Sequence, residues 1–188
     1  MADQLYLSYR LRGFTENNML RHYEKMLRQF PFSQLSQSES VYSMFAVSWA
    51  EPPLIERALP PPIDLNRIVS ESKENLSADV SVQLESYWDL WQYSDDWKLT
   101  PAPVMLSCFG PRFESEADDH LRIGFGLDAR FLPQSHLPNA AFMVQSNVRS
   151  LLHLVKEMDG VLAVEQRRLW SESGENFAGR LQSALVSG

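Results

Sequence analysis

The chain has 188 residues, a formal net charge of −7 and a pI near 5.1. This acidity argues against a nucleic-acid-binding protein, which needs a basic face. The single cysteine, Cys108, excludes an intrachain disulfide and fits a reducing compartment. The sequence shows no secretory signal pattern, and no apolar run approaches the roughly 20 residues of a membrane span. We therefore expect a soluble, cytoplasmic protein with neither a nucleic acid nor a membrane as partner.

Periodic apolar residues divide the first half of the chain into strand and helix patterns. Alternation from Leu5 to Leu11 predicts a half-buried strand. Apolar residues at helical spacing from Met19 to Phe30 predict an amphipathic helix, which Pro31 stops. The proline-rich segment 51–63 is expected to be a loop or an ordered connection. In chain order, the expected elements are a strand over 5–12, a helix over 15–30, a weak strand over 35–38, a strong strand over 40–49, a helix over 64–76 and an aromatic strand over 77–99.

The second half begins after the turn signals Pro101 and Pro103. The patterns that follow predict strands over 104–109 and 121–127, a long helix over 139–158, a strand over 161–170 and a short helix over Glu175–Leu185. Gly160 is a good stop for the long helix.

The order of elements suggests the fold class, which we expect to be α+β with a mainly antiparallel sheet. The first half, residues 1–98, has the βαββαβ order of a ferredoxin-like unit. The second half, residues 99–188, has the order ββαβα, which could be a degenerate related unit or could extend the first sheet. We expect the two parts to form one compact globular body. One continuous sheet with helices on one or both faces is the alternative.

The aromatic strand over 77–99 is the most unusual stretch. Its apolar even-numbered residues should face the core, because alternate side chains of a strand point to opposite faces; they are Val80, Val82, Leu84, Trp88 and Leu90. Its odd-numbered face begins polar and ends with Tyr87, Trp91 and Tyr93. A large aromatic patch is rarely left in water. Its cover could be another part of this chain, a second subunit or a ligand.

Two glycines of the strand over 121–127 form a second unusual feature. Gly124 and Gly126 lie on the face opposite the core residues of their strand. Glycine weakens a strand unless something approaches it closely. An aromatic ring from a neighbouring strand, such as Tyr87 or Trp91, is the structural explanation. Room for a ligand between Arg122 and Asp128 is the functional one.

The sequence carries no signature of catalysis or metal binding. The run Asp118-Asp119-His120 lacks further ligands at metal-binding spacing, and a solvated acidic loop explains it. Cys108 lies in an apolar strand, where a thiol is inert. Asp95-Asp96 is typical of a turn. We therefore assign no catalytic residue, no metal ligand and no cofactor.

Two hypotheses for the function remain. The first is a non-enzymatic interaction module, in which an aromatic sheet face binds a second copy of the chain or a protein partner. The second is a small-molecule-binding protein or enzyme with a pocket on the open sheet face. The candidate binding residues, common to both, are Tyr87, Trp91, Tyr93, Arg122, Gly124, Gly126 and Asp128.

Overall fold

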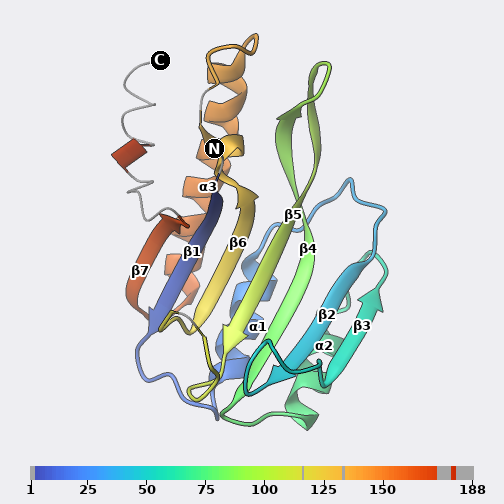
Figure 1. Cartoon of the computed structure of the whole chain (residues 1–188), viewed down its shortest axis with the longest axis vertical. Coiled ribbons are helices and arrows are strands. Elements are labelled where there is room, and N and C mark those ends of the chain that lie inside the picture. Colours follow the sequence, from blue (N-terminus) through green and yellow to red (C-terminus); the bar gives the residue numbers. More distant parts are fainter. Residues whose placement is uncertain (1–2, 116, 133, 173–178, 181–188) are drawn as a thin grey trace.

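The computed structural model of the chain describes residues 3–115, 117–132, 134–172 and 179–180. Within these residues, seven strands form one antiparallel sheet in the order β3-β2-β4-β5-β6-β1-β7, with three α-helices behind it in Figure 1. The elements are β1 (Gln4–Leu11), α1 (Met19–Gln29), β2 (Ser40–Ala46), β3 (Ile55–Leu59), α2 (Leu65–Glu74), β4 (Val80–Tyr93), β5 (Trp97–Phe109), β6 (Leu121–Leu127), the single 3-10 turn η1 (Asp128–Phe131), α3 (Ala140–Val161) and β7 (Val164–Ser171).

Each α-helix connects two strands that run in the same direction but are not neighbours. Because every neighbouring pair is antiparallel, β3 and β4 are parallel with β2 between them, and α2 crosses over β2. In the same way α3 joins β6 to β7 across β1. These split crossovers lay all three helices on one side of the sheet (Figure 1). We call this side the covered face and the other the open face.

The strands of the two halves of the chain are mixed in this sheet. Strand β1 lies between β6 and β7, and both β5 and β6 separate β4 from β1. The expected ferredoxin-like unit requires the strands of the first half to form a sheet of their own, so the strand order does not reproduce it. The α+β class and the antiparallel sheet are confirmed. The terminal helix expected over Glu175–Leu185 falls almost wholly outside the described residues.

The prediction of a weak strand over 35–38 is wrong, and β3 is the strand that pairs with β2 at this edge of the sheet. Strand β3 lies inside the proline-rich segment, where the prolines flank the strand rather than interrupt it, and it pairs with β2. The segment before β2 is instead fixed to β4 by Asp89. Its carboxylate accepts hydrogen bonds from the Ser33 hydroxyl at 2.5 Å and from the Gln34 backbone N–H at 2.8 Å.

The hydrophobic core lies between the sheet and the helices. The even-numbered side chains of β4 and the apolar stripe of α1 are buried there, as expected. The helical pattern over 139–158 places Leu152 on the core face and ends the helix before Gly160, and α3 differs at both points. Leu152 is exposed while Leu154 is buried, and the helix runs through Gly160 to Val161. Because Leu152 and Leu154 are two positions apart on a helix, only one of them can face the sheet.

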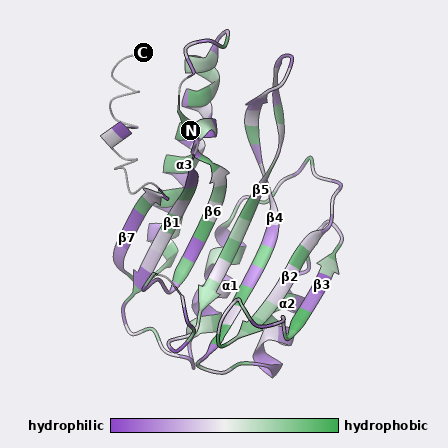
Figure 2. Cartoon of the chain, in the orientation of Figure 1, coloured by the Kyte–Doolittle hydropathy of each residue, from purple (hydrophilic) through white to green (hydrophobic). Residues whose placement is uncertain are grey.

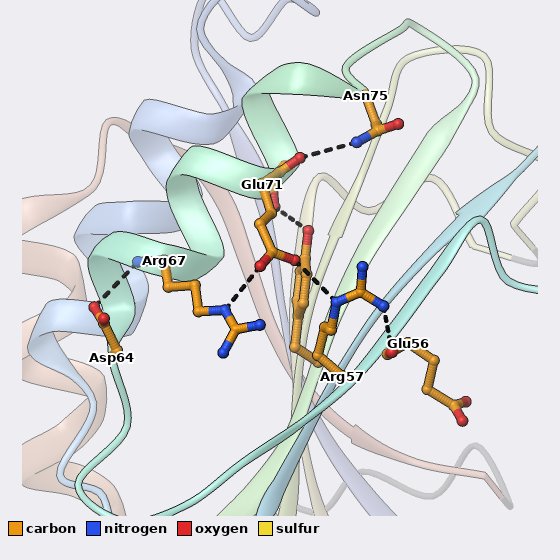
Figure 3. A network of polar contacts seen from close by, with 8 residues as sticks. Glu56, Arg57, Asp64, Arg67, Glu71 and Asn75 are labelled. Atoms are coloured by element: carbon orange, nitrogen blue, oxygen red, sulfur yellow. Dashed lines mark hydrogen bonds and ion pairs between the residues drawn. The ribbon is translucent and has the colours of Figure 1, made fainter.

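Helix α2 is fastened to the edge strand β3 by a polar network (Figure 3). Asp64 caps the helix by accepting a hydrogen bond from the Arg67 backbone N–H at 3.1 Å. The Glu71 carboxylate accepts a hydrogen bond from the Arg67 side chain at 2.8 Å and lies 3.5 Å from the Arg57 guanidinium of β3. The network connects the covered face to the edge of the sheet.

The β4–β5 hairpin rises beyond the rest of the sheet as a two-stranded ribbon (Figure 1). Pairing with β2 ends at Glu85 and pairing with β6 begins at Met105, so residues 87–103 have only each other as sheet partners. Pro101 and Pro103 lie inside β5, and the turn expected at these residues is wrong. Proline is tolerated there because this part of β5 has no second neighbouring strand to receive an N–H.

Candidate functional site

Strand register arranges the side chains of the open face in rows. One row is polar from edge to edge, because the pairs Ser43–Gln83, Gln83–Ser107 and Ser107–Arg122 are each in register. A largely apolar row containing Met105 and Tyr6 lies on one side of it. In strand order, the polar row consists of Glu56, Ser43, Gln83, Ser107, Arg122, Ser8 and Arg168.

The middle of the polar row is the floor of a hollow of about 440 Å³. Tyr6 and Met105 form one wall of this hollow, and the aromatic rings of Phe45, Trp49 and Phe109 form the opposite wall. We call it the Arg122 hollow; its floor is Gln83, Ser107 and Arg122. Its volume falls within the range of small-molecule sites, roughly 300–1,000 Å³.

The floor of the Arg122 hollow presents polar side chains that the rest of the described chain does not use. Gln83 is 8% exposed and Ser107 is 3% exposed, neither side chain has a hydrogen-bond partner within the described part of the chain, and both line the hollow. The Ser81 hydroxyl, in the next row of β4, is fully buried and also lacks a partner among these residues. A buried polar group without a hydrogen bond lowers the stability of a fold.

Arg122 is held at one end of the hollow by an ion pair and three rings. Its Nε and Nη2 donate to the Asp119 carboxylate at 3.0 and 2.8 Å. Its guanidinium carbon lies 5.1 Å from the ring centroid of Phe109 and 5.6 Å from the centroids of Tyr6 and Trp170. Rings at this distance attract a cation through their π faces. Arg122 therefore has a fixed position on the open face.

A hydrogen-bonded chain from β7 holds Asp119 in turn. The Trp170 indole donates to the Ser8 hydroxyl at 2.9 Å, and this hydroxyl donates to the Asp119 carboxylate at 2.8 Å. Both side chains of the Arg122–Asp119 pair are 13% exposed or less. This series of side-chain hydrogen bonds links β7 and β1 to Asp119 and Arg122 of β6, in addition to the backbone pairing of the three strands.

A second hollow, of about 410 Å³, adjoins the first. Tyr6, Met105 and Gly124 line both hollows, while Tyr87 and Gly126 line only this one. We call it the Tyr87 hollow. Three of the expected binding residues, Tyr87, Gly124 and Gly126, thus meet at one place on the open face, and Arg122 lies in the hollow beside them.

Gly124 and Gly126 are approached closely for two different reasons. A Cβ atom added to Gly124 would lie 3.4 Å from the Tyr6 ring, so an aromatic ring does cover this glycine, but it comes from β1 rather than from Tyr87 or Trp91. Gly126 has φ +69° at a register shift between β1 and β6, as in a β-bulge. An added Cβ there would meet the Arg130 guanidinium at 2.5 Å.

Three other expected site residues lie elsewhere. Trp91 and Tyr93 are on the projecting hairpin, where Tyr93 contacts the Trp97 ring. Asp128 is buried in η1, where it accepts a hydrogen bond from the Asp3 backbone N–H at 3.2 Å and lies 3.4 Å from Arg180. The structure therefore does not bring these three together with Arg122, whose partner is Asp119.

Among the residues of the hollows that the sequence reasoning missed are Tyr6, Gln83, Met105 and Ser107. A signal was present in the parity of β4 and β5. The odd positions of both strands carry small or polar residues beside large apolar ones, as in Ser81, Gln83, Met105 and Ser107. This pattern identifies a site only when the strand register is known. The register places Ser107 next to Arg122, and Gln83 next to Ser107.

The other reactive groups lie away from the hollows or are shielded. Cys108 points into the core, and burial raises the pKa of its thiol. No group of three or more His, Cys, Asp or Glu residues suited to a metal ion occurs in the described residues. Among the described helices, none is long and apolar enough to cross a membrane.

Comparisons with models of protein families, with curated proteins and with solved structures found no match to this chain.

Proposed function

We propose that this protein binds a small molecule in the Arg122 hollow of its open sheet face. The observation that carries this proposal is the contrast between the walls and the floor of the hollow. Its walls are mainly aromatic, and its floor presents the amide of Gln83, the hydroxyl of Ser107 and the guanidinium of Arg122. Small-molecule sites are concave and mostly apolar, with a few placed polar groups that fix the orientation of the ligand.

The unpartnered floor favours a ligand over a purely structural role for this face. Gln83 and Ser107 have little exposed surface, make no side-chain hydrogen bond in the described residues and line the hollow. Their hydrogen-bonding groups are therefore available to a ligand. A small ligand can reach the recessed floor, whereas the flat surface of a partner protein would rest on the walls.

The chemistry of the floor supports binding rather than catalysis. An amide, a hydroxyl and a guanidinium can hydrogen-bond to a ligand, but none of them ordinarily changes its protonation state near neutral pH. General acid–base catalysis needs a group that does. We therefore propose a ligand-binding function and assign no reaction to the site.

Isothermal titration calorimetry with the neutral aromatic amide 2-naphthamide tests the proposal. Its rings match the aromatic walls, and its amide can hydrogen-bond to the floor. We expect saturable binding by the wild-type protein. Gln83→Leu should weaken this binding about tenfold, because it replaces the floor amide with an apolar group of similar size.

Val82→Ala is the matched control, because Val82 is the next residue of β4 and is fully buried on the covered face. It should lower stability by roughly 1–3 kcal/mol and leave binding of 2-naphthamide unchanged. Absence of saturable binding by the wild type, or equal weakening by both variants, would contradict a site in the Arg122 hollow.

A protein partner, including a second copy of the chain, is the other candidate. The rims of the hollow favour it, since Trp49 and Met105 are 38% and 36% exposed. Both edge strands carry charged residues, such as Arg57 of β3 and Arg168 of β7, and Figure 2 shows hydrophilic positions on both. Charged edges discourage strand addition, so a partner would bind the open face. Sedimentation equilibrium over a range of concentrations tests for a dimer, which Trp49→Ala should weaken.

We place the proposed binding activity in the cytoplasm. The support is the single cysteine of the chain, Cys108, which is a free, buried thiol. Free thiols persist in reducing compartments, whereas secreted proteins commonly contain disulfides. Targeting of a fluorescently tagged chain in its cells of origin would test this placement, and export of the chain would contradict it.

A further inference from the structure

We infer that the ligand of the Arg122 hollow is an aromatic anion, such as an aromatic carboxylate, with its negative group bound by Arg122. This inference rests on the proposed function and names the chemical class of the ligand. Three independent features of the hollow point to it: the N–H donors of Arg122 that remain unused, the charges around Arg122, and the aromatic rings that surround it.

Arg122 retains hydrogen-bond donors after forming its ion pair. A guanidinium carries five N–H groups in a planar fork. The Asp119 carboxylate receives donors from Nε and Nη2, and all of these contacts go to one carboxylate oxygen, Oδ2. Arg122 makes no further hydrogen bond to the described residues, and its side chain lines the hollow. The remaining donors can bind a second carboxylate in the geometry that arginine favours.

The charges around Arg122 also favour a negative group at this end of the hollow. Arg168 is the residue beyond Ser8 in the same polar row, and its guanidinium lies 4.7 Å from the centroid of the Trp170 ring. Arg168 has no ion-pair partner among the described residues. Asp119 compensates one positive charge, so the Arg122–Asp119–Arg168 group by itself keeps one positive charge, and the Glu172 carboxylate, which accepts a hydrogen bond from the Tyr6 hydroxyl at 3.3 Å, is a negative charge on the wall side.

The rings of the hollow suit the apolar part of such a ligand. The Phe109 and Tyr6 rings lie on either side of the polar row and both contact the Arg122 guanidinium. A flat aromatic group that enters between these walls can stack or pack edge-to-face. Its carboxylate would then reach Arg122 at the floor. Ser107 lies next to Arg122 in register, and its hydroxyl can donate to the same group; Gln83 lies one strand further along the floor, beyond Ser107.

The experiment compares two probes of nearly equal shape, 2-naphthoate and 2-naphthamide, by isothermal titration calorimetry with the full chain. We expect the wild type to bind the carboxylate about tenfold more tightly than the amide, because hydrogen bonds to charged groups are the stronger ones. Arg122→Gln should remove this preference, because it weakens the binding of 2-naphthoate about tenfold more than the binding of 2-naphthamide. Arg168→Gln should reduce the preference by about threefold.

Asp119→Asn gives the discriminating result. Asparagine keeps an oxygen that can accept from Ser8 and Arg122, but it removes the negative charge that competes with the ligand. We expect it to increase the affinity for 2-naphthoate several-fold and to leave that for 2-naphthamide unchanged. A purely structural role for the ion pair would make Asp119→Asn and Arg122→Gln weaken both probes alike.

Two controls keep the outcomes distinct. Glu85→Gln changes the net charge by the same amount as Asp119→Asn, but Glu85 lines the Tyr87 hollow, so the preference for 2-naphthoate should change less than twofold. If Arg122→Gln fails to fold, the Arg122→Gln, Asp119→Asn double variant leaves no buried charge behind and should also lack the preference.

Equal affinity for the two probes in the wild type and in Asp119→Asn overturns the inference and leaves the proposed function standing. Binding of neither probe overturns the proposed function itself.

Discussion

The two faces of the sheet place their polar side chains in different surroundings. On the covered face, the Tyr23 hydroxyl donates to the Leu106 carbonyl at 2.8 Å, and the hydroxyls of Tyr42 and Ser72 lie 2.7 Å apart in a hydrogen bond. The covered side also holds two buried polar atoms without a partner in the described residues, the Tyr9 hydroxyl and His22 Nδ1. On the open face, the Ser81 hydroxyl is buried without such a partner, and Gln83 lies at the floor of the Arg122 hollow. Unpartnered polar atoms thus occur on both sides, and on the open face they lie in or beside a hollow.

This difference indicates where function can be sought from the structure alone. Both faces belong to the same strands and share one backbone, so their difference lies only in the side chains. A polar group that has a partner is explained by the fold. Polar groups that line a hollow without a partner in the described residues need a further explanation, and the proposed ligand is one such explanation. The predictions below test whether the two faces differ in this way.

The largest expected effect is on the covered face. Phe125 of β6 is fully buried and contacts the rings of Trp88 and Phe131. Phe125→Ala should lower the free energy of unfolding by about 3–5 kcal/mol, because it leaves a cavity in the core. The open-face counterpart is Phe45→Ala, which removes a half-buried ring and should cost about 1 kcal/mol. Urea unfolding measures both. Equal losses would mean that the open face is packed as a core.

The second effect tests how the projecting hairpin is attached. Asn147 of α3 accepts a hydrogen bond from the Trp91 backbone N–H at 2.8 Å and donates to the backbone carbonyls of Trp91 and Arg130 at 2.9 and 2.8 Å. Because Asn147 is 1% exposed, Asn147→Ala leaves three backbone groups without a partner and should cost about 2–3 kcal/mol.

The same site offers a matched variant that keeps the size of the side chain. Asn147→Asp can still accept from the Trp91 N–H but cannot donate to either carbonyl, so it should not restore the stability lost in Asn147→Ala. Thermal unfolding followed by circular dichroism measures both variants. Wild-type stability in Asn147→Asp would show that the two donated hydrogen bonds contribute little.

Local patterns predicted the elements better than they predicted the sheet. Alternation identified the buried faces of β1, β4 and β6, because one face of each strand contacts the helices. The order of the strands could not be read in this way. Nothing in the residues of β1 states that its neighbours are β6 and β7, since that choice depends on crossovers between distant segments. The proline-containing part of β5 was missed because its lack of a second neighbour is a tertiary property.

The same limit explains the candidate site. Tyr87, Gly124 and Gly126 were expected and line one hollow, because parity assigned each to the face opposite the core. Trp91 was expected beside them by the same parity, but it lies on the part of the hairpin that extends past the paired sheet. Gln83 was passed over because an isolated glutamine on a strand is ordinary. Only the register shows that it adjoins Ser107 and Arg122.

The third effect is a dependence of stability on pH that arises away from the hollows. The Nδ1 of His120 accepts a hydrogen bond from the Leu11 backbone N–H at 2.8 Å, and its ring stacks on Phe14 at 4.1 Å. Burial, with a smaller contribution from Arg10, lowers the pKa of His120 below its usual value of about 6.5. A proton on Nδ1 would also displace the Leu11 N–H. The folded state therefore binds protons less readily than the unfolded state.

The sign of this effect follows from the lowered pKa. The stability due to His120 is complete above about pH 6.5 and is lost as the pH falls through the lower pKa of the folded state. Burial also lowers the pKa of His22, which adds to the effect with the same sign. Urea unfolding between pH 7.5 and 5 should show falling stability in the wild type and a smaller fall in His120→Gln. A wild-type stability that rises toward pH 5 would contradict the assignment.

The smallest effect gives the sharpest comparison, because two fully buried serines should respond to the same substitution with opposite signs. Ser72 of α2 lies on the covered face and hydrogen-bonds to Tyr42, so Ser72→Ala leaves the tyrosine hydroxyl unpaired and should cost about 1–2 kcal/mol. Ser81 of β4 has no partner in the described residues, so Ser81→Ala removes an unpaired hydroxyl and should leave stability unchanged or raise it by up to about 1 kcal/mol. Urea unfolding of both variants under one set of conditions measures the difference. A loss in Ser81→Ala as large as that in Ser72→Ala would mean that the Ser81 hydroxyl stabilises the open face, and would contradict the difference between these two serines.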